Sequence, residues 1–198
     1  ERIVPPIDLL HHFSDFIRAG NTDKLQKLYR YLALYWTTHY QEFAHVEASC
    51  RHKNCPNQTV DSYFLFLLRN VAWVPAGARL EPHAPKHIWL LGETEPVDVR
   101  TLVPSLPDEL REAEYQPLNT ELRFKSSGTA TVDDYTDLLR LFPNRYPLQV
   151  PDFDLDELRR WHKSVRAVFN WVCEHIQTGL VNRGDPLPPL PPGLYLLA

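Results

Sequence analysis

Proline sets the tightest limit on how this chain can fold. Eighteen of its 198 residues are proline, against seven glycines. Proline has no backbone donor and a fixed φ, so it interrupts helices and is excluded from central strands. The prolines at 75, 82 and 85 restrict their segment to short edge strands. Those at 96, 104, 107 and 117 leave at most a short acidic helix, over residues 108–114. We therefore expect helices separated by proline-bounded connections.

Apolar residues recur with helical spacing in five segments between these connections. The predicted helices cover residues 7–18, 22–43, 61–68, 132–142 and 155–176. Asn21 or Thr22, Asp61, Thr131 and Asp154 stand where side-chain caps are expected. Gly20 and Gly179 follow two of the helices, where a left-handed residue would end them.

The stretch from Asn70 to Gly92 predicts a β-hairpin. Its strands are expected at residues 72–74, 79–81 and 88–91, with a turn near Gly77, and residues 48–59 are expected to form a loop. His83 and His87 would then lie in an exposed connection. The predicted structural anchors are three tryptophans and one proline: Trp73, Pro75, Trp89 and Trp161. The predicted fold class is α+β, predominantly helical, with amphipathic helices packed on short proline-bounded hairpins.

A hydrophobic content of 43% in 198 residues is enough to bury a substantial core. We expect a helical region over residues 1–143, which includes the hairpin at about 70–92, followed by a long helix and proline-rich tail over 144–198. The two parts are expected to form one compact unit. The start at Glu1, without any Met in the chain, predicts a piece of a larger protein.

Charge and hydropathy narrow the class of partner. The formal net charge is −4, and no block of five or six like charges occurs, which disfavours nucleic acid and anionic membranes. The longest apolar run, residues 63–68, is too short to cross a bilayer, and the first twenty residues lack the apolar core of a signal peptide. We therefore expect a cytoplasmic protein whose partners are proteins or other domains of its parent chain.

One segment carries residues that bind metals. Cys50, His52 and Cys55, with His45 upstream, offer soft ligands to zinc. A structural zinc site needs four converging ligands, and this C-x4-C spacing supplies about three of them. The sequence leaves two interpretations open, a zinc site or a solvated loop.

The sequence shows no motif for catalysis. We find neither the G-x-S-x-G turn of a nucleophilic serine nor the glycine-rich cradle of a phosphate loop. We therefore expect no catalytic residue, no cofactor-binding residue and no cofactor apart from the possible zinc.

Four segments resemble the region that follows the ATPase domain in sacsin-like and NO VEIN-like proteins. They are FLLRN-x-x-WVP at 66–75, P-x-x-IWL at 85–90, TATVDDYTDLLRLF at 129–142 and DELRRWHKSVRAVFNWV at 156–172. Together they cover roughly half of the chain. Members of that family carry a histidine-kinase/Hsp90-type (GHKL) ATPase domain, whose nucleotide-binding motifs are not found in this sequence.

The resemblance implies a non-catalytic interaction or coupling module of a larger GHKL-type ATPase, such as a chaperone-like or prokaryotic defence protein. The alternative is a small zinc-stabilised domain that binds protein or nucleic acid through the loop between Cys50 and Cys55. An enzyme whose active-site residues are dispersed along the sequence is a third hypothesis.

Overall fold

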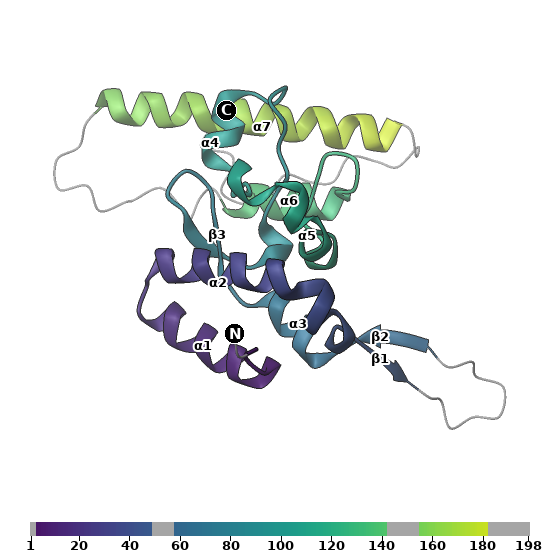
Figure 1. The fold of residues 1–198 in the computed structure, drawn as a ribbon. Coiled ribbons are helices and arrows are strands. Elements are labelled where there is room, and N and C mark those ends of the chain that lie inside the picture. The colour runs from purple at the N-terminus through teal and green to yellow at the C-terminus, as the bar shows by residue number, and fades with distance from the viewer. Residues whose placement is uncertain (1–2, 49–57, 142–154, 182–198) are drawn as a thin grey trace. The chain divides into compact units, whose positions relative to one another are not determined.

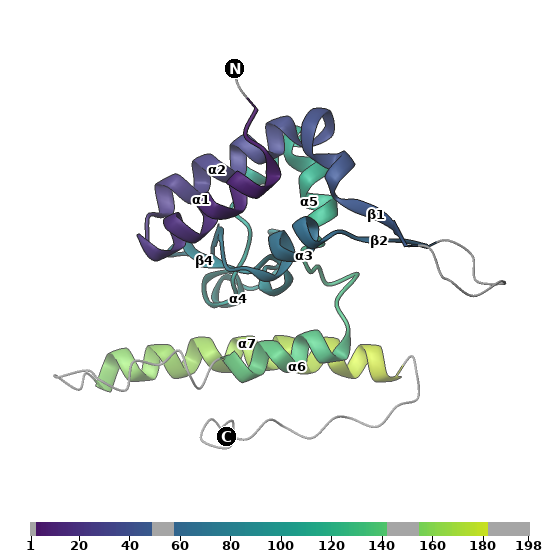
Figure 2. The same cartoon turned by 90° about the horizontal axis from the view of Figure 1, so that it is seen from below.

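The computed structural model describes residues 3–48, 58–141 and 155–181. Within these ranges the chain is predominantly helical and has two small antiparallel sheets, β1–β2 and β3–β4 (Figures 1 and 2). The predicted α+β, predominantly helical fold class is confirmed.

Contacts between residues divide the chain into two compact units. Unit 1 comprises Glu1–Trp89 and Ser105–Phe124, and unit 2 comprises Leu90–Pro104 and Lys125–Ala198. The boundary that the sequence predicts at residue 143 lies outside the described residues. Each unit therefore contains segments that are far apart in the sequence.

Unit 1 begins with helices and continues with two small hairpins. Its elements are α1 (Pro6–Arg18), α2 (Thr22–Tyr35), the π-helical turn η1 (Trp36–Tyr40), the 3-10 turn η2 (Gln41–Phe43), β1 (His45–Ala48), β2 (Gln58–Asp61), α3 (Tyr63–Asn70), β3 (Val74–Ala76), β4 (Glu81–His83), the 3-10 turns η3 (Pro85–His87), η4 (Asp108–Leu110) and η5 (Ala113–Tyr115), and α5 (Gln116–Leu122).

The first two helices follow their sequence signals. Gly20 has a φ of +60° directly after α1, in the left-handed region that glycine adopts without a steric penalty. The Asn21 side chain then accepts a hydrogen bond from the Lys24 amide at 3.0 Å and caps α2. The aromatic stripe of α2 continues through η1, where Trp36 and Tyr40 are fully buried. Phe43 was expected in this stripe, but it is 44% exposed because the helix has already given way to the turn η2.

Trp73 lies at the centre of the unit 1 core. Its ring stacks on Phe13 at a centroid distance of 4.9 Å and contacts Tyr29 at 5.6 Å. The indole Nε1 donates a 2.7 Å hydrogen bond to the carbonyl oxygen of Leu68. The Tyr29 hydroxyl donates to Asn119, whose amide in turn donates to the Leu110 carbonyl oxygen at 2.9 Å. The core is therefore both aromatic and hydrogen-bonded.

The hairpin predicted around Trp73 is present, but both of its strands lie two residues later than predicted. β3 pairs with β4, so that Pro75 faces Pro82 and Val74 faces His83. His83 is consequently a half-buried strand residue and does not lie in an exposed connection, whereas His87 is exposed as expected. Residues 88–91 form no strand: Trp89 makes one parallel bridge to Ser105. The Gly77 amide also donates to the Ser105 carbonyl oxygen, at 2.9 Å.

Two helices lie where proline was expected to prevent them. Pro96 is the N-cap residue of α4 (Val97–Leu102), and Pro117 lies in the first turn of α5. The missing N–H of proline costs nothing in the first turn, because those amides have no helical partner. In place of the short helix predicted at 108–114, the structure has the turns η4 and η5.

Unit 2 is built on one long helix. Its elements are α4, α6 (Val132–Leu141) and α7 (Leu155–Val181), and both α4 and α6 pack on α7. Ser164 on α7 donates a 2.6 Å hydrogen bond to Asp98 on α4, and Tyr135 on α6 contacts the ring of Trp171 at 5.5 Å. No described helix is long and apolar enough to span a membrane.

The ends of these helices test two predictions. The Thr131 hydroxyl accepts a hydrogen bond from the Asp134 amide, and the Asp134 carboxylate accepts one from the Thr131 amide at 2.8 Å. Thr131 therefore caps α6 as predicted, and the reciprocal hydrogen bonds make the pair a capping box. Gly179, predicted to end the last helix, lies inside α7, which runs on to Val181. The predicted cap Asp154 lies outside the described residues.

Candidate interaction surface at the β1–β2 hairpin

The β1–β2 hairpin projects from the helices of unit 1 (Figures 1 and 2). Its register pairs His45 with Asp61 and Val46 with Val60. The sequence predicts no strand in this region: the loop expected over residues 48–59 includes only the last residue of β1 and the first two of β2, so both strands were missed. The usual signal is absent because seven of the eight strand residues are exposed and His45 is half-buried. Neither strand contributes a buried apolar face.

Ser62 ties the root of the hairpin to α3. Its amide donates to the Ala44 carbonyl oxygen at 2.9 Å, and its hydroxyl donates to the Phe43 carbonyl oxygen at 2.5 Å. The same hydroxyl accepts a hydrogen bond from the Leu65 amide at 3.2 Å and caps α3. The cap is therefore Ser62, and the prediction of Asp61 was wrong by one residue. Asp61 remains in β2, where its carboxylate is available for a different contact.

That contact is with Arg69, the centre of a charge cluster at the hairpin root. The Arg69 side chain is 10% exposed. Its Nη1 forms an ion pair with Asp61, and its Nε donates a 2.6 Å hydrogen bond to the Glu121 carbonyl oxygen. Its Nη2 lies 3.6 Å from the Glu121 carboxylate. One guanidinium thus connects β2, α3 and α5, with the planar fork that suits arginine to paired carboxylates.

His45 closes the cluster from β1. Its Nδ1 lies 3.5 Å from Asp61 and its Nε2 lies 3.3 Å from the Glu121 carboxylate. Arg123 approaches Asp61 at 3.9 Å from the exposed side. Burial lowers the pKa of Arg69, and Arg123 lowers it further, while Asp61 and Glu121 oppose the shift. The carboxylates therefore offset the cost of partly removing the charged guanidinium from water.

The strands above this root carry apolar side chains into solvent. Because side chains alternate along a strand, Val46 and Val60 share one face and His45 and Asp61 share the other. Nine large hydrophobic side chains among the described residues are exposed, and five of them lie within residues 43–66. These five define the hairpin patch: Phe43, Val46, Val60, Tyr63 and Phe66. Within it, the rings of Tyr63 and Phe66 stack at a centroid distance of 6.4 Å.

The predicted metal ligands Cys50, His52 and Cys55 lie outside the described residues. His45, the upstream histidine, contacts Asp61 and Glu121. Within residues 3–48, 58–141 and 155–181, no group of three or more His, Cys, Asp or Glu side chains is arranged to hold a metal ion. The cation at the centre of the described cluster is Arg69.

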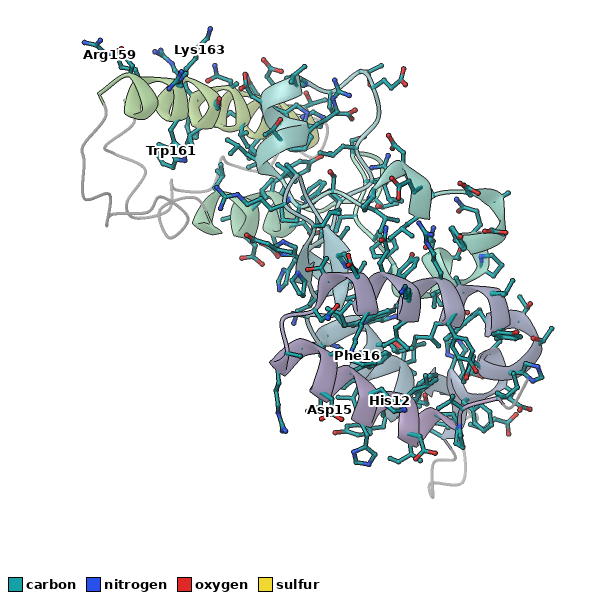
Figure 3. The ribbon with its side chains drawn as sticks, turned by 60° about the vertical axis from the view of Figure 1, so that its left-hand side comes forward. His12, Asp15, Phe16, Arg159, Trp161 and Lys163 are labelled. Carbon is teal, nitrogen blue, oxygen red and sulfur yellow. The ribbon has the colours of Figure 1, made fainter. Side chains whose placement is uncertain are left out.

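The predicted anchors differ in burial. Trp73 and Trp89 are 0% and 1% exposed, and Pro75 is buried in β3. Trp161 is half-buried, and it projects from the side of α7 opposite Arg159 and Lys163 (Figure 3). The anchoring role itself stays a prediction for all four residues.

Sequence reasoning missed the charge cluster altogether. One signal was available, since Arg69 is the only charged residue in the apolar helix α3. A lone charge in such a helix has to find a partner when it is buried. Its partner Glu121 is 52 residues away, in a helix that the sequence did not predict.

Comparison of the chain with protein-family models, curated proteins and solved structures gives no match. The case for a function therefore rests on the geometry of the hairpin and on the segments quoted above.

Proposed function

We propose that this chain is a non-catalytic protein-interaction module and that the hairpin patch is its principal contact surface. One observation carries the proposal: the β1–β2 ribbon is fixed at its root by a charge cluster, yet its strands bury almost nothing. Two-stranded ribbons are at best marginally stable alone in water. The contacts of Ser62 and Arg69 are what hold this one in place.

The ribbon has the features of a surface that pairs with another chain. Each strand has one edge that pairs with no other strand of the described ranges, and such an edge can add a strand from a partner. Val46 and Val60 offer an apolar face beside those edges, and Tyr63 and Phe66 offer large aromatic contact area. Aromatic side chains are enriched at protein interfaces.

The finer form of the proposal is coupling to a GHKL-type ATPase in the parent chain. It rests on the resemblance of the quoted segments. One of them, residues 66–75, supplies both Arg69 at the hairpin root and Trp73 in the core. A shift in the position of α3 would therefore be transmitted to the hairpin through the contacts of Arg69.

Photo-crosslinking from inside the patch tests the proposal. A benzophenone amino acid would replace Tyr63, which is 71% exposed, in the full-length parent protein within its own cells. Val97, 69% exposed on α4, provides the matched control position. We expect a discrete protein adduct from position 63 and none from position 97. Equal adducts from both positions, or none from position 63, would contradict the proposal.

The identity of the adduct separates the hypotheses. An adduct with a GHKL domain that changes with bound nucleotide supports coupling, and an adduct with a separate protein supports a recruiting role. The zinc-stabilised alternative predicts about one zinc ion per chain by elemental analysis, removed by a chelator with loss of stability.

A further inference from the structure

A second surface of unit 1 is a groove between the helices α1 and α2. The groove has a volume of about 480 Å³ and is open to solvent. Its lining residues are Val4, Leu9, His12, Phe16, Lys24, Lys27, Leu28 and Tyr31. Leu9 and Leu28 form a buried apolar floor, and the volume lies within the range of about 300–1,000 Å³ that is typical of ligand sites.

The lining follows both helices for two turns. On α1 the lining runs from Leu9 to Phe16 and on α2 from Lys24 to Tyr31, a span of seven residue steps along each helix. At 1.5 Å per residue the groove is about 10 Å long. One end is fixed by the N-terminal segment, since the Val4 amide donates a 3.2 Å hydrogen bond to the Tyr31 hydroxyl.

The charges on the lining have one sign. Lys24 and Lys27 are exposed, and the lining, which also includes His12 and Tyr31, contains no carboxylate. The Lys24 ammonium lies 5.5 Å from the centroid of the Phe16 ring, a cation–π contact. Neither lysine forms an ion pair with a described residue. Figure 3 shows His12, Asp15 and Phe16 together on α1; Asp15 is not part of the lining.

An adjoining depression shows which side of the surface carries negative charge and which carries positive charge. It shares Val4 and His12 with the groove and is otherwise lined by Ile3, Pro5, Asp8 and His11. Asp8 gives this end of the surface its carboxylate, whereas the two lysines are on the α2 side. A complementary partner therefore carries its acidic residues on the flank that faces α2.

We propose that this groove binds an acidic amphipathic helix of a partner protein, with two or three apolar side chains at i, i+3 or i+4, and i+7 in the groove and carboxylates over Lys24 and Lys27. Helices that dock in grooves use this anchor spacing, which spans two turns and matches the length of the lining. An acyl chain in the same open groove would leave much of its length in water, so the geometry favours a helix over a lipid.

Selection from an unbiased library tests this inference. Random 16-residue peptides displayed on phage would be selected on the 198-residue chain, and the enriched peptides would then be synthesised. We expect acidic peptides with the spacing given above. Their affinity should fall at least about tenfold in the variant Lys24→Glu/Lys27→Glu, as for paired charges at an interface, and should weaken with added salt.

The matched control is Lys163→Glu, the same charge reversal at an exposed lysine on α7. It should leave the affinity unchanged. Peptides with their α2-facing Glu residues changed to Lys should regain binding to Lys24→Glu/Lys27→Glu, which excludes misfolding as the cause of the loss.

Three results would overturn the inference: enriched peptides without acidic residues, equal loss in Lys24→Glu/Lys27→Glu and Lys163→Glu, or binding to vesicles of anionic phospholipid in place of any peptide. The inference is independent of the hairpin patch. Peptide binding should persist in Val46→Thr/Val60→Thr, so the two proposals fail separately.

Discussion

The Trp73 core and the β1–β2 hairpin lie in the same unit and use their side chains in opposite ways. Trp73, Tyr29 and Leu68 are fully buried, and the polar atoms of the two aromatic residues have hydrogen-bond partners. In the hairpin, Val46 and Val60 face solvent at 49% and 40% exposure. Among the residues that the structure describes, the side-chain hydrogen bonds and ion pairs of the hairpin are at its root.

This contrast separates residues that stabilise the fold from residues that the fold leaves exposed for contact with a partner. Burying a large side chain contributes about 1.5–3 kcal/mol, which an exposed valine in the ribbon does not gain. If the comparison is correct, complete removal of a side chain's contacts should lower the free energy of unfolding most in the core, less at the hairpin root and least in the strands.

The largest effect is expected in the core. Trp73→Ala should lower the free energy of unfolding by about 3–5 kcal/mol, because it removes a ring that stacks on Phe13 and leaves a cavity. Urea denaturation followed by circular dichroism measures the loss. The control is Trp161→Ala, at a half-buried ring, which should cost clearly less. Equal losses would show that burial does not rank these two positions.

The root should come next. Arg69→Met should lower the free energy of unfolding by about 2–3 kcal/mol, because it leaves the carboxylates of Asp61 and Glu121 without their buried cation. Amide hydrogen exchange should also accelerate in β1 and β2. Arg123→Met is the control: this side chain is 68% exposed, and exposed ion pairs contribute about 0–1 kcal/mol. The role of Arg69 is refuted if both variants behave alike.

A smaller and pH-dependent effect is expected at Tyr29. Burial, with a contribution from Tyr115, raises the pKa of the Tyr29 hydroxyl far above its ordinary value of 10.0. In the unfolded chain this hydroxyl ionises above about pH 10, whereas in the fold it stays neutral. Its contribution is thus fully present below pH 10 and is lost as the pH rises above that value.

Tyr29→Phe should therefore cost about 1–2 kcal/mol at pH 7, since Asn119 loses its donor, and should flatten the decline of stability above pH 10. Urea titrations between pH 7 and pH 11 measure both effects. Tyr63→Phe, at a side chain that is 71% exposed, should change stability at pH 7 by less than about 0.5 kcal/mol. An unchanged alkaline profile in Tyr29→Phe would disprove the assignment.

The sequence predicted elements whose signals are local. Gly20, Asn21 and Thr131 act within a few residues of their own positions, and each stands where the structure has a helix end. The same local rules misplaced α4 and α5, because a proline that cannot continue a helix is well suited to begin one. Gly179 costs a helix about 1 kcal/mol, which is too little to end α7 where α4 and α6 pack on it.

The candidate surface could not be predicted because its signals are not local. β1 and β2 have four residues each and no buried face, so no periodicity distinguishes them from a loop. Their position depends on Arg69 meeting Asp61 and Glu121, and that pairing joins segments up to 52 residues apart. The lone arginine of α3 predicts that a partner exists without saying where it is.

The double variant Val46→Thr/Val60→Thr tests the central claim most directly. Threonine keeps the branched shape that suits a strand and replaces one methyl group by a hydroxyl on each side chain. The free energy of unfolding should change by less than about 0.5 kcal/mol, as for exposed positions generally. Affinity for the protein crosslinked at position 63 should fall about tenfold, as for residues near the centre of an interface. An unchanged affinity, or a loss of stability above about 2 kcal/mol, would contradict the account of the hairpin as a presented surface.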